Sequence, residues 1–163
     1  MRALLLVAIV TAASLLARAQ DAAPLFAATL TDLDGQPRAL AQWQGRPLIV
    51  NFWARWCGPC RSEIPELARL GRQYREQGLE VIGIGIEDKL EPVRDFARAY
   101  EMDYPVLIGR EQGLALMRQL GNAKLGLPFT VALDRRGQIV AVKLGAISPA
   151  ELSAAAQAAL KPR

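Results

Sequence analysis

The chain of 163 residues is long enough for one domain with a sizeable core, and 52% of its residues are hydrophobic. Its formal net charge is +4, but Arg2 and Arg18 lie in the N-terminal leader, and the remaining 18 basic and 16 acidic residues are scattered. This mixed, nearly neutral surface argues against a nucleic-acid partner.

Residues 1–19 have the pattern of a secretory signal peptide. Arg2 supplies the positive charge, residues 3–16 the apolar region, and residues 17–19 an A-x-A cleavage site. The apolar stretch is short for a bilayer span of about 20 residues, although an uncleaved membrane anchor is the alternative. We therefore expect residues 20–163 to form an exported domain, in the periplasm or another compartment outside the cytoplasm.

Turn residues and apolar periodicity divide the remaining chain into alternating strands and helices. In chain order we expect a loose leader (20–24), a hairpin (26–31 and 37–40), a strand (48–53), a helix kinked at Pro65 (57–77), a strand (79–86), a helix (91–100), a short strand (104–108), a helix (111–120), a second hairpin (129–134 and 138–144) and a final helix (148–160). The apolar runs 48–53 and 79–86 are typical of strands buried on both faces. Ser148 and Glu151 form a capping box at the start of the last helix. This order predicts a three-layer α/β/α domain with a mixed central sheet.

The only two cysteines of the chain, Cys57 and Cys60, stand where the first apolar strand meets the following helix. A C-x-x-C pair can close a small disulfide and reopen it, and a helix N-terminus stabilises the thiolate that attacks. Gly58 and Pro59 suit the first turn of such a helix. A structural disulfide is one alternative, but so short a loop removes little entropy from the unfolded chain. A zinc site would need further Cys or His ligands, and the sequence has none.

Together these motifs resemble the thioredoxin fold, in particular the exported TlpA/ResA/CcmG-like thiol-disulfide oxidoreductases. The resemblance covers nearly everything after the leader. It rests on the run 51–60 (NFWARWCGPC), on Pro65 within the active-site helix, and on the run 126–130 (GLPFT) before the second hairpin. The stretch 87–107 matches the central α/β insertion of this branch.

Pro128 matches the proline that in this family has a cis bond and packs against the disulfide. The resemblance therefore implies a cis bond between Leu127 and Pro128, with the Leu127 backbone beside the cysteines, where it receives an extended segment of the client. Without the resemblance, a trans bond at a strand entry would be the expectation, since only about 5–6% of X-Pro bonds in folded proteins are cis.

Glu63 follows Cys60 by three residues and shares a helical face with Leu67 and Leu70. A carboxylate on an apolar face is costly unless it is paired or functional. In ResA- and CcmG-like proteins a glutamate here lies under the active site, so the resemblance implies that burial raises the pKa of Glu63 and that Glu63 relays a proton for Cys60. A surface glutamate is the alternative. Cytoplasmic thioredoxins have a buried aspartate at the position of Asn51, which cannot titrate, so a general thioredoxin is disfavoured.

The expected reaction is thiol–disulfide exchange, which requires no cofactor and no metal. Cys57 attacks a disulfide of a client protein, and Cys60 resolves the mixed disulfide. Trp56, Gly58 and Pro59 line the surface that the client touches, although Trp56 is equally suited to packing. After each reaction, a membrane-bound thiol electron donor would reduce the Cys57–Cys60 disulfide again. We expect the protein itself to be a monomer. The client could be an apocytochrome in cytochrome c maturation, a copper-site assembly factor or a broader set.

Three other functions use the same sequence features. A disulfide-forming oxidant would run the reaction in reverse at the same cysteines. A peroxiredoxin-like peroxide reductase usually has Thr-x-x-Cys, whereas this chain has Ala54 three residues before Cys57. A redox-inert binding or holdase module would have no need of an intact C-x-x-C.

Overall fold

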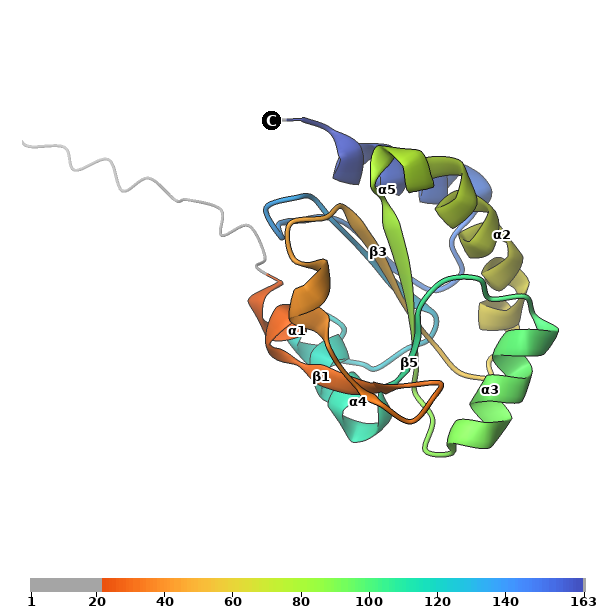
Figure 1. Cartoon of the computed structure of the whole chain (residues 1–163). Coiled ribbons are helices and arrows are strands. Elements are labelled where there is room, and N and C mark those ends of the chain that lie inside the picture. Colours follow the sequence, from red (N-terminus) through yellow and green to blue (C-terminus); the bar gives the residue numbers. More distant parts are fainter. Residues whose placement is uncertain (1–21, 163) are drawn as a thin grey trace, which may run out of the picture.

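A computed structural model of the chain describes residues 22–162, so the signal peptide expected at residues 1–19 lies outside the described part (Figure 1). The helices are α1 (Ala23–Ala27), α2 (Gly58–Tyr74), α3 (Leu90–Ala99), α4 (Arg110–Gln119) and α5 (Pro149–Leu160), with 3₁₀ turns η1 (Leu40–Trp43) and η2 (Arg75–Gln77). The strands are β1 (Thr29–Asp32), β2 (Pro37–Ala39), β3 (Leu48–Trp53), β4 (Glu80–Gly85), β5 (Val106–Ile108), β6 (Phe129–Leu133) and β7 (Ile139–Leu144).

The seven strands form one mixed sheet in the order β2-β1-β5-β4-β3-β6-β7. Strands β3, β4 and β5 are parallel neighbours, because helices connect them. The two hairpins, β1–β2 and β6–β7, add antiparallel strands at the two edges. The expected mixed sheet with an N-terminal hairpin and a central α/β insertion is thus confirmed.

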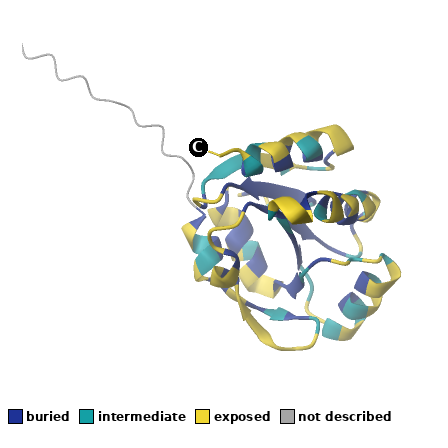
Figure 2. Ribbon diagram, turned by 45° about the horizontal axis from the view of Figure 1, so that its top comes forward, coloured by how far each residue is buried: buried dark blue, intermediate teal, exposed yellow. Residues whose placement is uncertain are grey.

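Helices cover both faces of the sheet and make it the middle of three layers. Alternate residues of β3 serve the two faces: Ile49 and Trp53 pack with α2, α3 and α5, whereas Val50 and Phe52 pack with α1 and α4. All six residues of β3 are buried, as the apolar run predicts. Figure 2 shows the buried sheet between helices whose outer faces are exposed.

The active-site helix α2 follows the sequence rules closely. Pro59 lies in its first turn, where a missing N–H costs little, and the helix continues through Pro65 to a 3₁₀ turn that ends at Gly78. Gly78 has a φ of 86°, a left-handed conformation that favours glycine. At the other end of the chain, the capping box between Ser148 and Glu151 begins α5 as expected.

The expectation of a loose leader at residues 20–24 is wrong for residues 22–24, which the structure describes. Residues Ala23–Ala27 form the short helix α1, with Pro24 in its first turn and Leu25 buried in the core. The sequence gives little sign of so short a helix, because the helix is stabilised by the burial of Leu25 and not by its helix propensity. Among the described residues, no helix is long and apolar enough to cross a membrane.

Candidate active site

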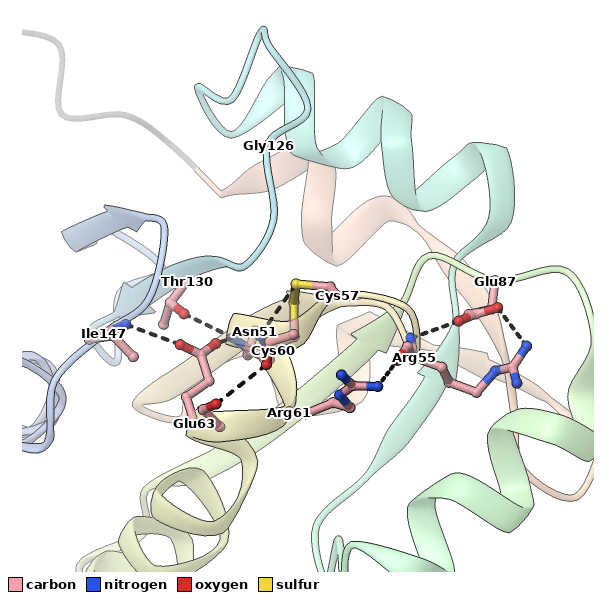
Figure 3. The surroundings of a disulfide bond; sticks show 12 residues. Asn51, Arg55, Cys57, Cys60, Arg61, Glu63, Glu87, Gly126, Thr130 and Ile147 are labelled. Carbon is pink, nitrogen blue, oxygen red and sulfur yellow. Dashed lines mark hydrogen bonds and ion pairs between the residues drawn. A yellow bond between two sulfur atoms is a disulfide. The ribbon is translucent and has the colours of Figure 1, made fainter.

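Cys57 and Cys60 form a disulfide at the N-terminus of α2, with their Cα atoms 5.3 Å apart (Figure 3). Cys57 is the N-cap residue, and its Sγ accepts a hydrogen bond from the backbone N–H of Cys60 at 3.3 Å. Cys57 retains 6% exposure, whereas Cys60 is fully buried. The partial positive charge of the helix terminus and this N–H favour a thiolate on Cys57 when the disulfide is open.

The loop between β3 and α2 is anchored by charged side chains. Glu87, which follows β4, accepts hydrogen bonds from the backbone N–H of Arg55 at 2.8 Å and from its guanidinium at 3.3 Å. Arg61 in α2 donates to the carbonyl of Arg55 at 3.5 Å. Two elements on opposite sides of the loop therefore hold the residues just before Cys57 in place (Figure 3).

Glu63 lies beneath the disulfide and is 3% exposed. Its Oε1 accepts a hydrogen bond from Asn51 Nδ2 at 2.7 Å, and its Oε2 accepts one from the backbone N–H of Ile147 at 3.0 Å. Burial raises the pKa of Glu63, and these two hydrogen bonds oppose the rise without cancelling it. The burial expected for Glu63 is confirmed, a surface position is excluded, and the direction of the pKa shift agrees with the expectation.

Asn51 connects Glu63 to the centre of the sheet. It is fully buried in β3, and its Nδ2 also donates to Thr130 Oγ1 on β6 at 3.0 Å. In the sequence, Asn51 is distinguished only by its difference from the aspartate of cytoplasmic thioredoxins. Neither its bond to Glu63 nor the role of Thr130 has a local sequence signal, because the partners lie 12 and 79 residues away.

The segment before β6 approaches the disulfide from the other side. The peptide bond between Leu127 and Pro128 is cis, as the resemblance implies. Phe129 pairs with Phe52 near the end of β3. Pro128 therefore lies at the same end of the strands as the loop that leads from β3 to Cys57. Trp56, next to Cys57, is 70% exposed, which disfavours the packing interpretation.

Among residues 22–162, no group of three or more His, Cys, Asp or Glu side chains is arranged to hold a metal ion. The reactive groups that this site brings together are the two sulfur atoms of the disulfide and the buried carboxyl of Glu63. This arrangement matches a dithiol that exchanges disulfides.

A family model described as Redoxin matches residues 18–159, nearly the whole domain. The chain belongs to the Redoxin family. Within this family it is 32% identical over 133 residues to the thiol-disulfide oxidoreductase ResA of Halalkalibacterium halodurans, covering 82% of this chain and 72% of that relative. ResA of Geobacillus kaustophilus is 28% identical, with 76% and 68% covered.

Solved structures agree with this placement of the Redoxin chain. A thioredoxin-family thiol:disulfide interchange protein from Chlorobium tepidum superposes with a TM-score of 0.70 at 29% identity, covering 82% of this chain and 93% of that one. A secreted disulfide oxidoreductase of Mycobacterium tuberculosis shares the fold, with a TM-score of 0.69 at 23% identity, covering 82% and 96%. The protein is a thiol-disulfide oxidoreductase of the thioredoxin fold, and its substrates carry disulfides.

Proposed function

We propose that this Redoxin protein reduces disulfides in exported client proteins, with Cys57 as the nucleophile and Cys60 as the resolving cysteine. The observation that carries the proposal is the position of the Cys57–Cys60 disulfide at the start of α2, directly above a buried carboxyl. The difference in exposure between the two sulfur-bearing residues supports the division of roles, because a client can reach Cys57 but not Cys60.

The reaction balances without a cofactor. In the reduced protein the Cys57 thiolate attacks one sulfur of the client disulfide, and the other client sulfur leaves as a thiolate that takes up a proton. Cys60 then loses its proton and attacks Cys57 in the mixed disulfide, which releases the second client thiolate. Two electrons pass to the client, and the protein is left with the disulfide between its two cysteines.

Glu63 is suited to take the proton from Cys60 in the second step. The two residues are three positions apart on α2 and therefore share a helical face. A raised pKa brings a carboxyl closer to neutrality, where it can exchange protons with a thiol near physiological pH. Asn51 and Ile147 fix the carboxyl through its two oxygens, which keeps it oriented in the core.

The client-binding surface in this proposal surrounds Cys57. Trp56 supplies an exposed aromatic ring, and Gly58 and Pro59 leave the sulfur accessible at the helix start. The backbone of Leu127, before the cis bond to Pro128, offers a polar edge to an extended client segment. Large aromatic side chains of this kind often contribute much of the binding energy at protein interfaces.

Export and the direction of electron flow are the remaining parts of the proposal. The signal-like leader supports export, as does the secreted relative from Mycobacterium tuberculosis. The Gly58-Pro59 dipeptide, which resembles that of the reducing thioredoxins, supports the reducing direction. Because an oxidising compartment offers no pool of reduced thiols, a membrane-bound thiol electron donor would restore the dithiol.

The proposal is tested by mixing the reduced protein with a peptide that contains one intramolecular disulfide. We expect one peptide disulfide to be reduced for each protein molecule oxidised, measured by mass spectrometry after alkylation of free thiols. The reverse experiment, with oxidised protein and reduced peptide, should give little peptide oxidation. Predominant transfer in the reverse direction would instead identify an oxidant.

A further inference from the structure

Unpaired polar atoms gather beside Glu63, in the layer between the sheet and helices α2 and α3. Four buried side-chain atoms of residues 22–162 have no hydrogen-bond partner: Asn51 Oδ1, Trp53 Nε1, Arg55 Nε and Tyr104 OH. Asn51 and Trp53 alternate along β3 and therefore face the same side of the sheet. Buried polar atoms in proteins are almost always satisfied, and ordered water serves where the chain offers no partner.

Gly83 on β4 marks the point where Trp53 and Tyr104 meet. A Cβ atom at Gly83 would lie 3.1 Å from Trp53 Nε1 and 3.1 Å from Tyr104 Cε2, so the two rings converge above this glycine. Asn51 is the register partner of Gly83 in the parallel β3–β4 ladder. Three of the four unpaired atoms thus belong to residues around one backbone position.

The oxygen of the Asn51 amide is unpaired, whereas its nitrogen is fully used. Its Nδ2 is occupied by Glu63 and by Thr130, and Thr130 lies on β6. Strands β6 and β4 flank β3 on opposite sides. Because Nδ2 is used by Glu63 and by Thr130 on the β6 side, Oδ1 is the part of the amide left for a partner on the β4 side, where Gly83 lies.

We propose that Tyr104 is a positioning residue for Glu63 and that, with Trp53 and Asn51, it holds an internal water molecule among the unpaired polar atoms of these three residues. A water molecule accepts two hydrogen bonds and donates two. The Tyr104 hydroxyl and the Trp53 indole N–H are the two donors to it, and Asn51 Oδ1 and a free lone pair of the Glu63 carboxylate are the two acceptors. One water molecule would therefore satisfy all three unpaired atoms and add a third hydrogen bond to Glu63.

The electrostatics of Tyr104 agree with this arrangement. Its pKa is raised far above the ordinary value, first by burial and then by the negative charges of Glu63 and Asp103, so the hydroxyl keeps its proton and can donate. The elements that pack around Glu63 carry further titratable and charged groups: Cys57 and Cys60 on α2 and, closer to solvent, the Arg72–Asp103 and Lys143–Glu151 ion pairs.

The inference deepens the proposed function, because it assigns Tyr104 the task of stabilising the ionised form of the carboxyl that serves Cys60. Removal of the hydroxyl should therefore raise the pKa of Glu63. Since a hydrogen bond to a charged group is stronger than one between neutral groups, the Tyr104→Phe substitution should lower the acid dissociation constant of Glu63 about tenfold.

The experiment is a ¹³C NMR titration of the Glu63 side-chain carboxyl in the full domain, with its signal assigned by Glu63→Gln. The matched control is Tyr100→Phe, which removes a tyrosine hydroxyl from the aromatic stack that Trp53 forms with Phe96 and Tyr100. We expect the Glu63 pKa to rise in Tyr104→Phe and to stay unchanged in Tyr100→Phe. If the acid dissociation constant of Glu63 in Tyr104→Phe is within twofold of the wild-type value, the proposal is overturned.

A high-resolution crystal structure supplies the second readout. We expect an ordered water molecule within hydrogen-bond distance of Tyr104 OH and Asn51 Oδ1, and its loss or displacement in Tyr104→Phe. Absence of this water from the wild-type crystal would contradict the proposal whatever the titration shows. The first readout concerns the pKa of Glu63 and the second the water molecule, so both stand even if Glu63→Gln leaves the titration of Cys60 unchanged and the proton-relay function fails.

Discussion

Asn51 Nδ2 donates a hydrogen bond of 2.7 Å to Glu63 Oε1 in the fully buried space between β3 and α2. The bond joins the central strand to the helix that carries both cysteines. Because asparagine cannot titrate, any proton exchanged at this position belongs to Glu63 rather than to its partner. The sheet thus orients the buried carboxyl through a partner that does not itself titrate.

The buried carboxyl predicts a pH dependence of stability. The folded-state pKa of Glu63 is raised above its ordinary value of 4.5, so the folded protein binds the proton more tightly than the unfolded chain does. The free energy of unfolding of the oxidised wild type, relative to Glu63→Gln, is therefore greatest below about pH 4.5 and falls as the pH rises through the folded-state pKa. Urea unfolding at a series of pH values measures this difference. A difference that stays constant with pH, or increases, would contradict the raised pKa.

The roles of the cysteines predict two distinct variants. Cys57→Ser should lose exchange with a disulfide-bearing peptide entirely, because Cys60 is buried and cannot reach the client. Cys60→Ser should instead accumulate a mixed disulfide with the peptide, which non-reducing mass spectrometry detects. Turnover at the wild-type rate in either variant would contradict the roles assigned to Cys57 and Cys60.

The exposure of Trp56 predicts that its removal lowers activity toward protein clients selectively. Its side chain is 70% exposed, so Trp56→Ala should leave the free energy of unfolding within about 0.5 kcal/mol of wild type. The same change should lower kcat/KM for a protein disulfide about fivefold or more, since interface tryptophans often contribute over 1 kcal/mol. The reaction with a small disulfide should change little.

The matched control for Trp56 is Val142→Ala, another exposed hydrophobic residue, which lies on the edge strand β7. It should leave both reactions near wild type. Equal losses with protein and small-molecule disulfides in Trp56→Ala would indicate an effect on the cysteines rather than on client binding.

Two glycines predict opposite effects on stability. A Cβ at Gly109 would lie 2.8 Å from Ile84 Cγ2 and 3.0 Å from the Gly113 Cα, so Gly109→Ala forces a shift in the core and should destabilise the fold by about 1–3 kcal/mol. Gly71 lies inside α2 with an ordinary clearance of 3.4 Å to Val81. Gly71→Ala should therefore stabilise by up to about 1 kcal/mol through helix propensity. Urea denaturation compares the two variants, and equal effects would contradict the packing argument.

Much of this architecture is readable from local sequence patterns. The apolar run that forms β3 lacks the alternation of a half-exposed strand, and both of its faces prove to be buried. Gly78 and Ser148 mark helix boundaries by backbone conformation and capping, which depend on a few neighbouring residues. Such features are predictable because their physical causes lie within one or two turns of the chain.

The surroundings of Glu63 are not predictable in this way. Its position on the apolar face of α2 follows from spacing, but its partners come from β3 and from the backbone of Ile147, 84 residues away. Tyr104 reads as the start of an ordinary strand in the sequence, although β5 begins only at Val106. The convergence of these groups on Gly83 depends on strand register, which sequence spacing alone does not define.

The most direct test of the account is the reduction potential of the Cys57–Cys60 couple, measured by tryptophan fluorescence in glutathione and dithiothreitol buffers of defined ratio. A reductant that depends on an external electron donor should have a value near that of thioredoxin, about −270 mV. A value near about −120 mV, typical of a strong disulfide-forming oxidant, would contradict the proposed direction of electron flow.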